Sequence, residues 1–574
     1  MTSQVKERWS AWSSRQLEDM DLSRELEEIK EDEAAISDRF YKELEFGTGG
    51  LRGVIGAGTN RMNIYTVAKA SQGYADYLNQ GKRPASVAVA YDSRIKSELF
   101  ARTAAEVFAA NGLHVYIYKE LMPTPSLSFA VRYLHCAGGI VVTASHNPAK
   151  YNGYKVYGGD GCQITSKAAK DILSCINQVD TFEGVRKLSF EEAMKAGRIS
   201  YIEDEVSTAY INAVSAESLC GSQLKKDVSI VYTPLNGTGR YCVTRALEEN
   251  GFHNVKVVAE QQWPDGNFPT CPYPNPEVRE ALELAVDYAK QTDSDLVLAT
   301  DPDCDRVGIA VRNPQGEYTL LSGNEVGVLL LDYVCSRRKE TGKMPERPVA
   351  VKTIVTMDMA KQVAADHHVE LREVLTGFKY IGEQIGLLEA EGEEERYIFG
   401  FEESYGYLSG SYVRDKDGVD ASLLICEMFA FYKAQGRSLL EVLEGLYNRY
   451  GYCLTTLRSY AFEGEAGFAK MQAIMEGLRT RCPEHFAGKK VLSVSDYEKS
   501  ITENEDGSQE EIHLPKSNVL KFRLEGNSSL VVRPSGTEPK LKIYFSVSSP
   551  SRPEAKILEE QIAGEMEQRL NCYE

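Results

Sequence analysis

The sequence has no apolar run that could cross a membrane. A transmembrane helix needs roughly 18 or more consecutive apolar residues, and no stretch of the 574 residues comes near that length. Residues 1–45 are polar and carry many charges of both signs, so they lack the apolar centre of a secretory signal. We therefore expect a cytoplasmic protein with no membrane contact.

Cysteine motifs for metal binding are also missing. The twelve cysteines are scattered, with no C-x-x-C pair and no cluster of cysteine with histidine. This spacing argues against a structural zinc site and predicts reduced, mostly buried thiols.

The sequence lacks a basic excess. Its 65 lysines and arginines are outnumbered by 84 acidic residues, for a net charge of −19. Nucleic acids and anionic membranes bind basic surfaces, so we expect neither as a partner. A small anionic ligand is not excluded, because a basic pocket can form on an acidic protein. Neither a Walker A sequence nor a G-x-G-x-x-G fingerprint is present, so ATP-driven and NAD-linked functions have no support.

An alternation of strand-like and helix-like segments follows the helical first 45 residues. Short apolar runs, such as 86–91, 138–143 and 295–299, alternate with helical patterns. This order is typical of a mostly parallel sheet covered by helices. The alternation occurs in three rounds, and from about residue 455 it changes to an α+β pattern with partly antiparallel strands.

The sequence thus predicts an α/β fold with three similar α/β domains of mixed, mostly parallel sheets and a C-terminal α+β domain. We place these domains at residues 1–205, 206–320, 321–454 and 455–574. Ligands of open α/β sheets bind beyond the carboxyl ends of the strands. Loops at those ends are therefore the candidate sites.

The run T-A-S-H-N-P at residues 143–148 follows an apolar strand. Ser145 at this strand end could be a nucleophile, although its hydroxyl is weak until a base or metal activates it. The alternative is a plain turn, because asparagine and proline are turn formers.

Three carboxylates alternate in D-P-D-C-D at residues 301–305, directly after a buried strand. In an extended segment Asp301, Asp303 and Asp305 project to one side, so all three can reach one ion. Hard cations such as Mg²⁺ prefer oxygen ligands, whereas zinc prefers cysteine and histidine. We therefore favour a magnesium site over a solvated acidic turn.

Two further loops carry polar side chains. R-P-S-G-T-E-P-K at 533–540 combines an arginine fork with hydroxyls and a glycine, which suits a phosphate but also a polar hairpin. G-F-E-E-S-Y-G-Y at 400–407 offers carboxylates and a hydroxyl that could hold sugar hydroxyls or cap a helix.

These four loops, in this order and with F-G-T-G-G-L-R-G at 46–53, resemble the α-D-phosphohexomutase superfamily. The 46–53 and 301–306 runs look most like its phosphoglucomutase/phosphopentomutase branch. The similarity covers essentially the whole chain and implies four domains around a central cleft, each contributing one loop.

The resemblance implies the roles of the reacting groups. Ser145 would carry the phosphoryl group and complete the metal site of Asp301, Asp303 and Asp305. Three further residues would lie near this group, two of them assisting proton transfer (His146 and Lys155) and one belonging to the N-terminal loop (Arg52).

The resemblance also implies the substrate contacts. Arg306 follows the metal loop, and Lys416 is similar to a cleft lysine of the glucose-specific enzymes. The sugar would be oriented and held by two loops, with positions Thr376, Gly377, Lys379, Glu402 and Ser404. The distal, non-reacting phosphate would bind at Arg533, Ser535, Gly536 and Thr537.

The activity implied is a phosphoglucomutase that interconverts glucose 1-phosphate and glucose 6-phosphate through a phosphoserine and glucose 1,6-bisphosphate. One Mg²⁺ per site would be the cofactor, a sugar phosphate the partner, and a monomer or weak dimer the assembly. Alternatives within this chemistry are a phosphopentomutase, a phosphomannomutase and a glucose 1,6-bisphosphate synthase.

Two other classes fit less well. A serine phosphatase would not need a second phosphate site such as the 533–537 loop. A non-enzymatic paralogue would be signalled by a missing serine or aspartate, and both motifs are intact.

Overall fold

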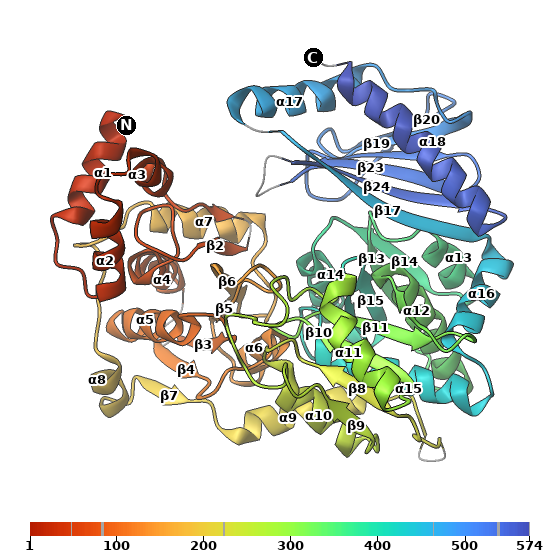
Figure 1. Cartoon of the computed structure of the whole chain (residues 1–574), viewed down its shortest axis with the longest axis horizontal. Helices are drawn as coiled ribbons and strands as arrows, with labels where there is room; N and C mark the ends of the chain where they lie inside the picture. Colours follow the sequence, from red (N-terminus) through yellow and green to blue (C-terminus); the bar gives the residue numbers. More distant parts are fainter. Residues whose placement is uncertain (48, 82–84, 222–223, 463, 536–539, 573–574) are drawn as a thin grey trace. The chain divides into compact units, whose positions relative to one another are not determined.

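The computed structural model describes residues 1–572 except 48, 82–84, 222–223, 463 and 536–539 (Figure 1). The chain forms two compact units. Unit 1 comprises Met1–Leu321, Gly382–Glu394 and Gly406–Ala430, and unit 2 comprises Ser322–Ile381, Glu395–Tyr405 and Phe431–Glu574.

The N-terminal region is helical, as the sequence predicts, but it is divided into three helices: α1 (Ser3–Ser13), α2 (Met20–Ile29) and α3 (Glu33–Phe40). Asp19 and Asp32 cause the divisions. Each accepts hydrogen bonds from backbone N–H groups in the first turn of the following helix, which favours a new helix start over continuation of the old one.

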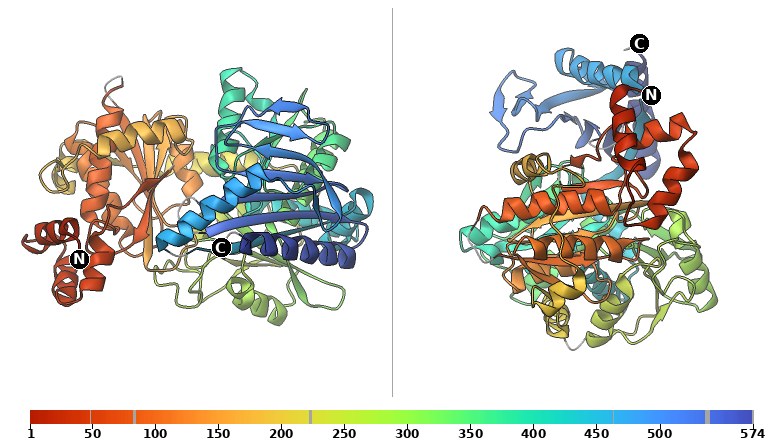
Figure 2. Two further views of the ribbon diagram at one scale, coloured as in Figure 1. Left: turned by 90° about the horizontal axis from the view of Figure 1, so that it is seen from above. Right: turned by 90° about the vertical axis from the view of Figure 1, so that its left-hand side faces the viewer.

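The first sheet of unit 1 has the strand order β1-β2-β6-β5-β3-β4-β7. Strands β5, β3, β4 and β7 are parallel, whereas β6, β2 and β1 extend the sheet with antiparallel pairs. The strands are β1 (Phe46–Gly47), β2 (Gly50–Val54), β3 (Ser86–Tyr91), β4 (His114–Ile117), β5 (Gly138–Val142), β6 (Tyr151–Gly158) and β7 (Ile199–Tyr201). The helices of this part of the chain are α4 (Ile64–Leu78), α5 (Ser97–Ala110), α6 (Thr124–Tyr133), α7 (Ser166–Ile176), α8 (Phe190–Lys195) and α9 (Asp204–Ala216). Figure 2 shows orange and gold helices beside the strands of this sheet.

The second sheet of unit 1 has the order β12-β11-β10-β8-β9. Its parallel strands are β8 (Ile230–Thr233), β9 (Val255–Val257) and β10 (Leu296–Thr300), and its antiparallel extension is β11 (Val307–Arg312) and β12 (Tyr318–Leu321). The associated helices are α10 (Gly239–Glu249) and α11 (Arg279–Gln291).

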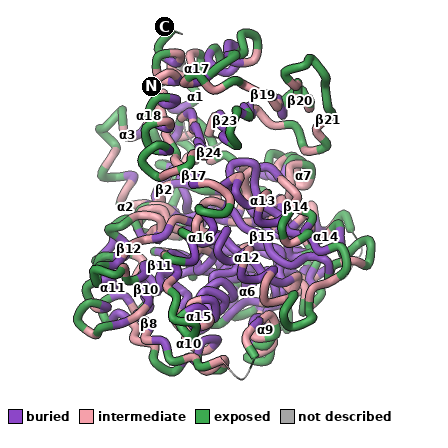
Figure 3. Tube along the Cα trace, turned by 90° about the vertical axis from the view of Figure 1, so that its right-hand side faces the viewer, coloured by how far each residue is buried: buried purple, intermediate pink, exposed green. Residues whose placement is uncertain are grey.

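Unit 2 begins with the parallel strands β14-β13-β15, which are β13 (Val349–Thr353), β14 (Glu370–Val374) and β15 (Tyr397–Glu402). The helices of this part of unit 2 are α12 (Gly323–Glu340), α13 (Met359–Asp366) and α16 (Leu439–Tyr450). The segments α14 (Phe378–Ala390), η1 (Glu394–Arg396) and α15 (Gly418–Ala434) are divided between the two units, and β16 (Gly406–Leu408) belongs to unit 1. Figure 3 shows β15 as a buried strand, which matches its continuous apolar run.

The C-terminal sheet is antiparallel, in the order β17-β24-β23-β22-β19-β20-β21, with β18 paired to β19. Its strands are β17 (Tyr452–Ala461), β18 (His485–Phe486), β19 (Lys489–Asp496), β20 (Ile501–Asn504), β21 (Gln509–Glu511), β22 (Leu520–Leu524), β23 (Ser528–Pro534) and β24 (Lys540–Ser549). Its helices are α17 (Gly464–Thr480) and α18 (Arg552–Asn571). The edge strand β21 is exposed (Figure 3).

The predicted fold class is confirmed, with three α/β sheets followed by a C-terminal domain of a different type. In the part of the chain that the structure describes, no helix is long and apolar enough to pass through a membrane. All twelve cysteines are free thiols, nearly all of them at least partly buried.

Candidate active site

Ser145 lies three residues beyond the buried strand β5, in a tight turn. Its φ of +52° falls in the left-handed region, which few non-glycine residues adopt. The turn is held by Thr143, whose Oγ1 accepts a hydrogen bond of 2.8 Å from the Ser145 N–H. Backbone strain of this kind is typical of a functional position, and here it fixes where the hydroxyl points.

Arg94 holds the Ser145 loop in place through hydrogen bonds to its backbone carbonyl oxygens. Its buried guanidinium donates to the carbonyl oxygens of Ser145 and Asn147, and its Nη1 donates to those of Pro148 and Tyr151 at 3.1 and 3.0 Å. The planar fork of arginine suits this pattern of several carbonyl acceptors. Sequence reasoning missed Arg94, because its D-S-R run looks like an ordinary strand-end turn.

The Ser145 hydroxyl is surrounded by an imidazole and a carboxylate. Its Oγ donates to Asp301 Oδ2 at 2.7 Å and lies 3.1 Å from His146 Nδ1. Burial and then the charges of Arg306 and Arg52 hold the pKa of His146 well below its usual range. A neutral imidazole can accept a proton from its neighbour.

The three predicted metal ligands converge at the end of β10. Asp301, Asp303 and Asp305 are almost completely buried, and one oxygen from each lies within 4.8 Å of the others. Oδ1 atoms of Asp303 and Asp305 have no hydrogen-bond partner within the described chain. Buried carboxylate oxygens without partners are costly, so this donor set fits a hard divalent cation such as Mg²⁺.

Two lysines face the same carboxylates. Lys155 Nζ on β6 lies 2.8 Å from Asp303 and 3.1 Å from Asp305, and Lys416 Nζ lies 3.0 Å from Asp305. Although burial acts in the opposite direction, the charge of Lys155 lowers the pKa of Asp303, and the two aspartates raise the pKa of Lys155. The carboxylates and ammonium groups therefore stabilise each other in their charged forms.

Residues of neighbouring segments hold the loop of Asp301, Asp303 and Asp305 in place. Thr124, at the start of α6, donates from its Oγ1 to Asp303 Oδ2 at 3.0 Å, and Thr238 donates from its backbone N to Pro302 O at 2.8 Å. A Cβ at Gly237 would lie 2.4 Å from Pro302 Cα, so only glycine allows this approach. The loop at residues 301–305 is thus in contact with the start of α6 through Thr124 and with the segment before α10 through Gly237 and Thr238.

Tyrosines anchor the two aspartates that flank Lys416. Tyr157 OH donates to Asp415 Oδ2 at 2.7 Å, and the buried Asp417 accepts from Tyr210 and Tyr412 at 2.9 and 2.8 Å. These tyrosines were not among the residues identified from sequence. They fix the backbone on both sides of Lys416.

The two arginines predicted for this site, Arg306 and Arg52, also lie beside the Ser145 loop and the aspartate triad. Arg306 follows the triad and donates from Nη1 to Glu277 Oε1 at 2.6 Å. Arg52 on β2 is exposed and donates to Asn147 Oδ1 at 3.3 Å, in the Ser145 loop. Unit 1 therefore brings together nine predicted site residues, namely Arg52, Ser145, His146, Lys155, Asp301, Asp303, Asp305, Arg306 and Lys416.

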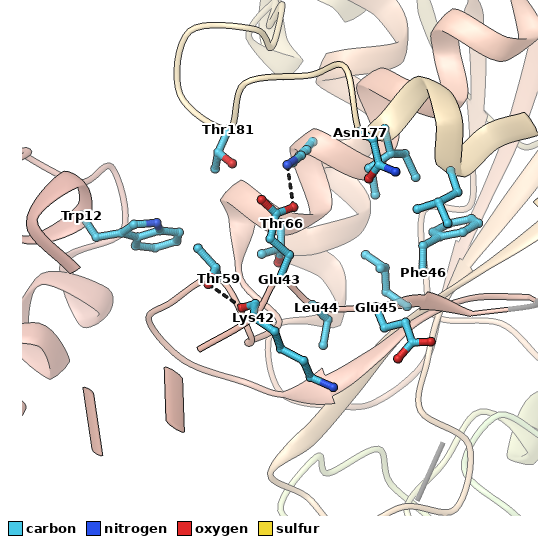
Figure 4. Close-up of a pocket in the computed structure, with 15 residues that line it drawn as sticks. Trp12, Lys42, Glu43, Leu44, Glu45, Phe46, Thr59, Thr66, Asn177 and Thr181 are labelled. Carbon is cyan, nitrogen blue, oxygen red and sulfur yellow. Dashed lines mark hydrogen bonds and ion pairs between the residues drawn. The ribbon is translucent and has the colours of Figure 1, made fainter. Parts of the chain in front are cut away.

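A separate cavity of about 350 Å³ lies elsewhere in unit 1 (Figure 4). Trp12 and Phe46 contribute to its walls, and Lys69 and Glu43 form an ion pair of 2.7 Å there. None of the predicted site residues is among the described residues that line it. The cavity is therefore distinct from the Ser145 site.

Unit 2 contains the predicted sugar-binding loops. Glu402 is buried at the end of β15, and Ser404 is half-buried two residues later. Between them, Glu403 Oε2 accepts a hydrogen bond of 3.1 Å from Thr353 Oγ1. Burial and then the charge of Glu402 raise the pKa of Glu403 to about 7.

Three other predicted contacts of unit 2 lie between the end of β14 and the first turn of α14. Thr376 follows β14 with a buried Oγ1 that has no hydrogen-bond partner within the described chain, and Gly377 has a φ of +119°. Lys379 is buried and its Nζ lies 5.2 Å from the centre of the Tyr380 ring.

The predicted distal-phosphate loop is described in part. Arg533 lies on β23, and Ser535 N donates to Lys540 O at 2.7 Å. Gly536 and Thr537 lie outside the described residues.

Family models match four successive parts of the chain. They are phosphoglucomutase/phosphomannomutase α/β/α domain I over residues 43–183, domain II over 208–316, domain III over 322–450, and the C-terminal domain over 488–565.

Individual proteins match over nearly their full lengths. A phosphoglucomutase of Staphylococcus haemolyticus is 37% identical over 89% of this chain and 91% of its own. The structure of parafusin from Paramecium, a phosphoglucomutase in an open form, aligns with a TM-score of 0.64 at 17% identity, covering 93% of this chain and 95% of that one. An N-acetylphosphoglucosamine mutase of Aspergillus fumigatus, solved with GlcNAc-6P and magnesium, aligns with a TM-score of 0.52 at 14% identity, covering 99% and 100%.

The two solved structures share the fold at low identity, whereas the family models and the bacterial relative match the sequence itself. On these matches the chain belongs to the phosphoglucomutase/phosphomannomutase family, within the α-D-phosphohexomutase superfamily that its loops resemble.

Proposed function

We propose that this protein is a phosphoglucomutase, an isomerase-class phosphotransferase that interconverts glucose 1-phosphate and glucose 6-phosphate. One observation carries the proposal: Ser145, in a strained turn, places its hydroxyl 2.7 Å from the first carboxylate of a buried aspartate triad. The name of the bacterial relatives, phosphoglucomutase, supports glucose as the sugar.

Ser145 is the phosphoryl carrier in this proposal. Phosphorylated Ser145 gives its phosphoryl group to the free hydroxyl of the bound monophosphate, which yields glucose 1,6-bisphosphate. The P–O bond to Ser145 breaks as the bond to the sugar oxygen forms, and the sugar hydroxyl loses its proton. The bisphosphate then turns around and returns its other phosphate to Ser145.

The chain's own residues supply acid–base and charge functions. His146 and Lys155 lie around Ser145 and the triad, where they can hold or move the proton of the sugar or serine hydroxyl. Arg52, Arg306 and Lys416 add positive charge, which stabilises the charge that develops on the transferring group.

Asp301, Asp303, Asp305 and Ser145 are the residues that would hold one Mg²⁺. When bound, Mg²⁺ supplies positive charge that neutralises the phosphoryl oxygens. The Oδ1 atoms of Asp303 and Asp305 accept no hydrogen bond from the described residues, which supports this assignment.

The residues of unit 2 bind the substrate in this proposal. Glu402 and Ser404 hold sugar hydroxyls, and the loop of Thr376, Gly377 and Lys379 orients the sugar. The distal phosphate binds at Arg533, Ser535, Gly536 and Thr537, in either orientation of the sugar. The four domains of this proposal have boundaries at residues 1–205, 206–320, 321–454 and 455–574.

The physiological setting follows from the same proposal. The partner is a small sugar phosphate, glucose 1,6-bisphosphate is the activating intermediate, and the protein acts as a monomer or weak dimer. Twelve free thiols support a reducing, cytoplasmic location.

Two measurements test the proposal together. Intact-mass spectrometry should detect a labile phosphoryl group on the wild-type protein after exposure to glucose 1,6-bisphosphate, and none on Ser145→Ala. Rates on glucose 1-phosphate, ribose 1-phosphate and mannose 1-phosphate should then rank glucose first. Phosphate release without isomerisation would favour a phosphatase, and a faster rate on ribose 1-phosphate would favour a phosphopentomutase.

A further inference from the structure

A buried cluster of charges lies in unit 2 and contains none of the residues of the Ser145 site. Lys352 on β13 and Lys521 on β22 are buried, and both reach the carboxylates of Asp358 and Glu373. Lys361 on α13 contacts the same two carboxylates from a more exposed position. None of these residues takes part in the proposed chemistry.

The cluster joins two sheets that are far apart in sequence. Lys521 Nζ lies 3.0 Å from Glu373 Oε1 and donates to Ile354 O at 3.1 Å. Ser529 Oγ on β23 donates to Asp358 Oδ2 at 2.7 Å. The C-terminal sheet is therefore bonded directly to the carboxyl ends of the β13–β14 sheet.

Apolar side chains of the two sheets also pack against each other near these hydrogen bonds and ion pairs. Ile354, Val355 and Leu375 of the first sheet's loops pack with Tyr497, Val519, Val531 and Tyr544 of the C-terminal sheet. Buried ion pairs often add little net stability compared with apolar packing, and in some proteins they select one arrangement of the two sides. A geometric role is therefore more consistent with this cluster than a purely stabilising one.

Two of the strands that enter the cluster, β14 and β23, lead along the chain to proposed substrate contacts. Glu373 lies three residues before Thr376, and Ser529 lies four residues before Arg533 on the same strand. Lys352 donates to Thr356 O at 2.9 Å, and the Thr353 hydroxyl donates to Glu403 Oε2, between Glu402 and Ser404. Two proposed substrate-binding segments thus start from this buried network, and a third is linked to it through Thr353, next to Lys352.

We propose that the Lys521–Asp358–Glu373 cluster, with Ser529, sets the spacing between the sugar-binding loops and the strand that carries Arg533. These are positioning residues, because they act through the loops and do not touch the substrate. This inference rests on the proposed function, in which sugar and distal phosphate are bound at the same time. A misplacement of about 1 Å in such a pair of contacts can cost roughly a hundredfold in kcat/KM.

The test compares two lysines that contact the same carboxylates. Lys521→Met removes the bond across the two sheets, and Lys361→Met is the matched control within one of them. We expect Lys521→Met to raise KM for glucose 1-phosphate by about tenfold or more, with kcat within about threefold, and Lys361→Met to change KM less than about twofold. The rate at which phosphorylated Ser145 loses its phosphoryl group to water, followed by intact mass, should be unchanged because that loop belongs to unit 1.

Further variants keep the test decisive. Ser529→Ala removes one neutral donor and should raise KM by about threefold, and Lys521→Arg should restore part of the affinity lost in Lys521→Met. If Lys521→Met does not fold, the Ser529→Ala result decides. Unchanged KM in the folded variants, or equal changes in Lys521→Met and Lys361→Met, would overturn the positioning role. A wild-type protein without mutase activity would instead contradict the proposed function.

Discussion

The Ser145 site of unit 1 and the proposed sugar-binding loops of unit 2 differ in how they stabilise buried carboxyl groups. In unit 1, Lys155 and Lys416 contact the triad, and the pKa of Asp303 is lowered despite its burial. In unit 2, burial and Glu402 raise the pKa of Glu403 to about 7, with threonine hydroxyls as its partners. Fixed charge suits a site that stabilises a phosphoryl group, whereas near-neutral hydrogen-bonding groups suit a site that accepts a sugar in two orientations.

The largest effect should come from removing the phosphoryl carrier in unit 1. Ser145→Ala leaves no oxygen to hold the transferring group, so we expect kcat to fall by roughly 10⁴-fold or more. Circular dichroism should show an unchanged fold, because the hydroxyl is small and the loop is held by Arg94. Turnover like that of the wild type would contradict the phosphoserine mechanism.

Chelation tests whether the triad is a cation site. Removing divalent metal should lower kcat by roughly a hundredfold or more, and Mg²⁺ should restore it. Added Mg²⁺ should also raise the thermal midpoint of the wild type, since a ligand of the native state alone stabilises it. Asp303→Asn should lose that shift. Full activity in buffer shown to be free of metal would refute the assignment.

Arg94 tests whether the geometry of unit 1 matters as much as its charge. Arg94→Lys keeps the charge but cannot reach four carbonyl oxygens, so we expect a loss of about tenfold to a hundredfold in kcat with little change in KM. Arg102→Lys, at an exposed ion pair on α5, is the matched control and should behave like the wild type. Equal kinetics of Arg94→Lys and wild type would show that the loop needs no such support.

Arg533 tests the binding side of the comparison. Arg533→Met removes a charged donor to the distal phosphate, so KM should rise by about tenfold, with a smaller change in kcat. Steady-state kinetics with glucose 1-phosphate measure both constants. A loss confined to kcat would place Arg533 in the chemical step instead.

The smallest effect concerns Glu403 and pH. Its pKa is about 7 in the folded protein and 4.5 ordinarily, so unfolding favours release of its proton. The stability that protonated Glu403 contributes is therefore present below about pH 4.5 and is lost as the pH rises to about 7. Between about pH 5 and about pH 8, the thermal midpoint of the wild type should fall a few degrees more than that of Glu403→Gln. Parallel pH profiles would show that Glu403 is not perturbed.

Sequence patterns predicted the strands that are apolar and end in distinctive loops. Strand β3 at Ser86–Tyr91 has the expected bounds, and β10 at Leu296–Thr300 lies one residue beyond the expected 295–299. Strand β6 was missed because its run Y-N-G-Y-K-V-Y-G mixes glycine and lysine with aromatic residues. Its strand conformation depends on pairing with β5 and β2, which a local pattern does not contain.

The same limit applies to the candidate site. The three aspartates of the triad lie at alternate positions within five residues, so their spacing alone indicates an ion site. The contact of Tyr210 with Asp417 joins residues 207 positions apart, and Arg94 reaches a loop 51 positions away. Such long-range partners are set by tertiary packing and leave no local signal.

The clamp of Arg94 on the Ser145 loop has a consequence for each catalytic cycle. In the proposed mechanism Ser145 gains and loses a phosphoryl group in every turnover. A backbone rearrangement at each of these steps would add to the free-energy cost of the reaction. Because Arg94 already donates hydrogen bonds to four carbonyl oxygens of the loop, the backbone conformation is fixed. Only the Ser145 side chain beyond Cβ then changes when the phosphoryl group is gained or lost. The position of Ser145 Oγ is thus organised before the substrate binds. The conformational entropy of ordering the loop is lost once, when the chain folds, and not in each turnover.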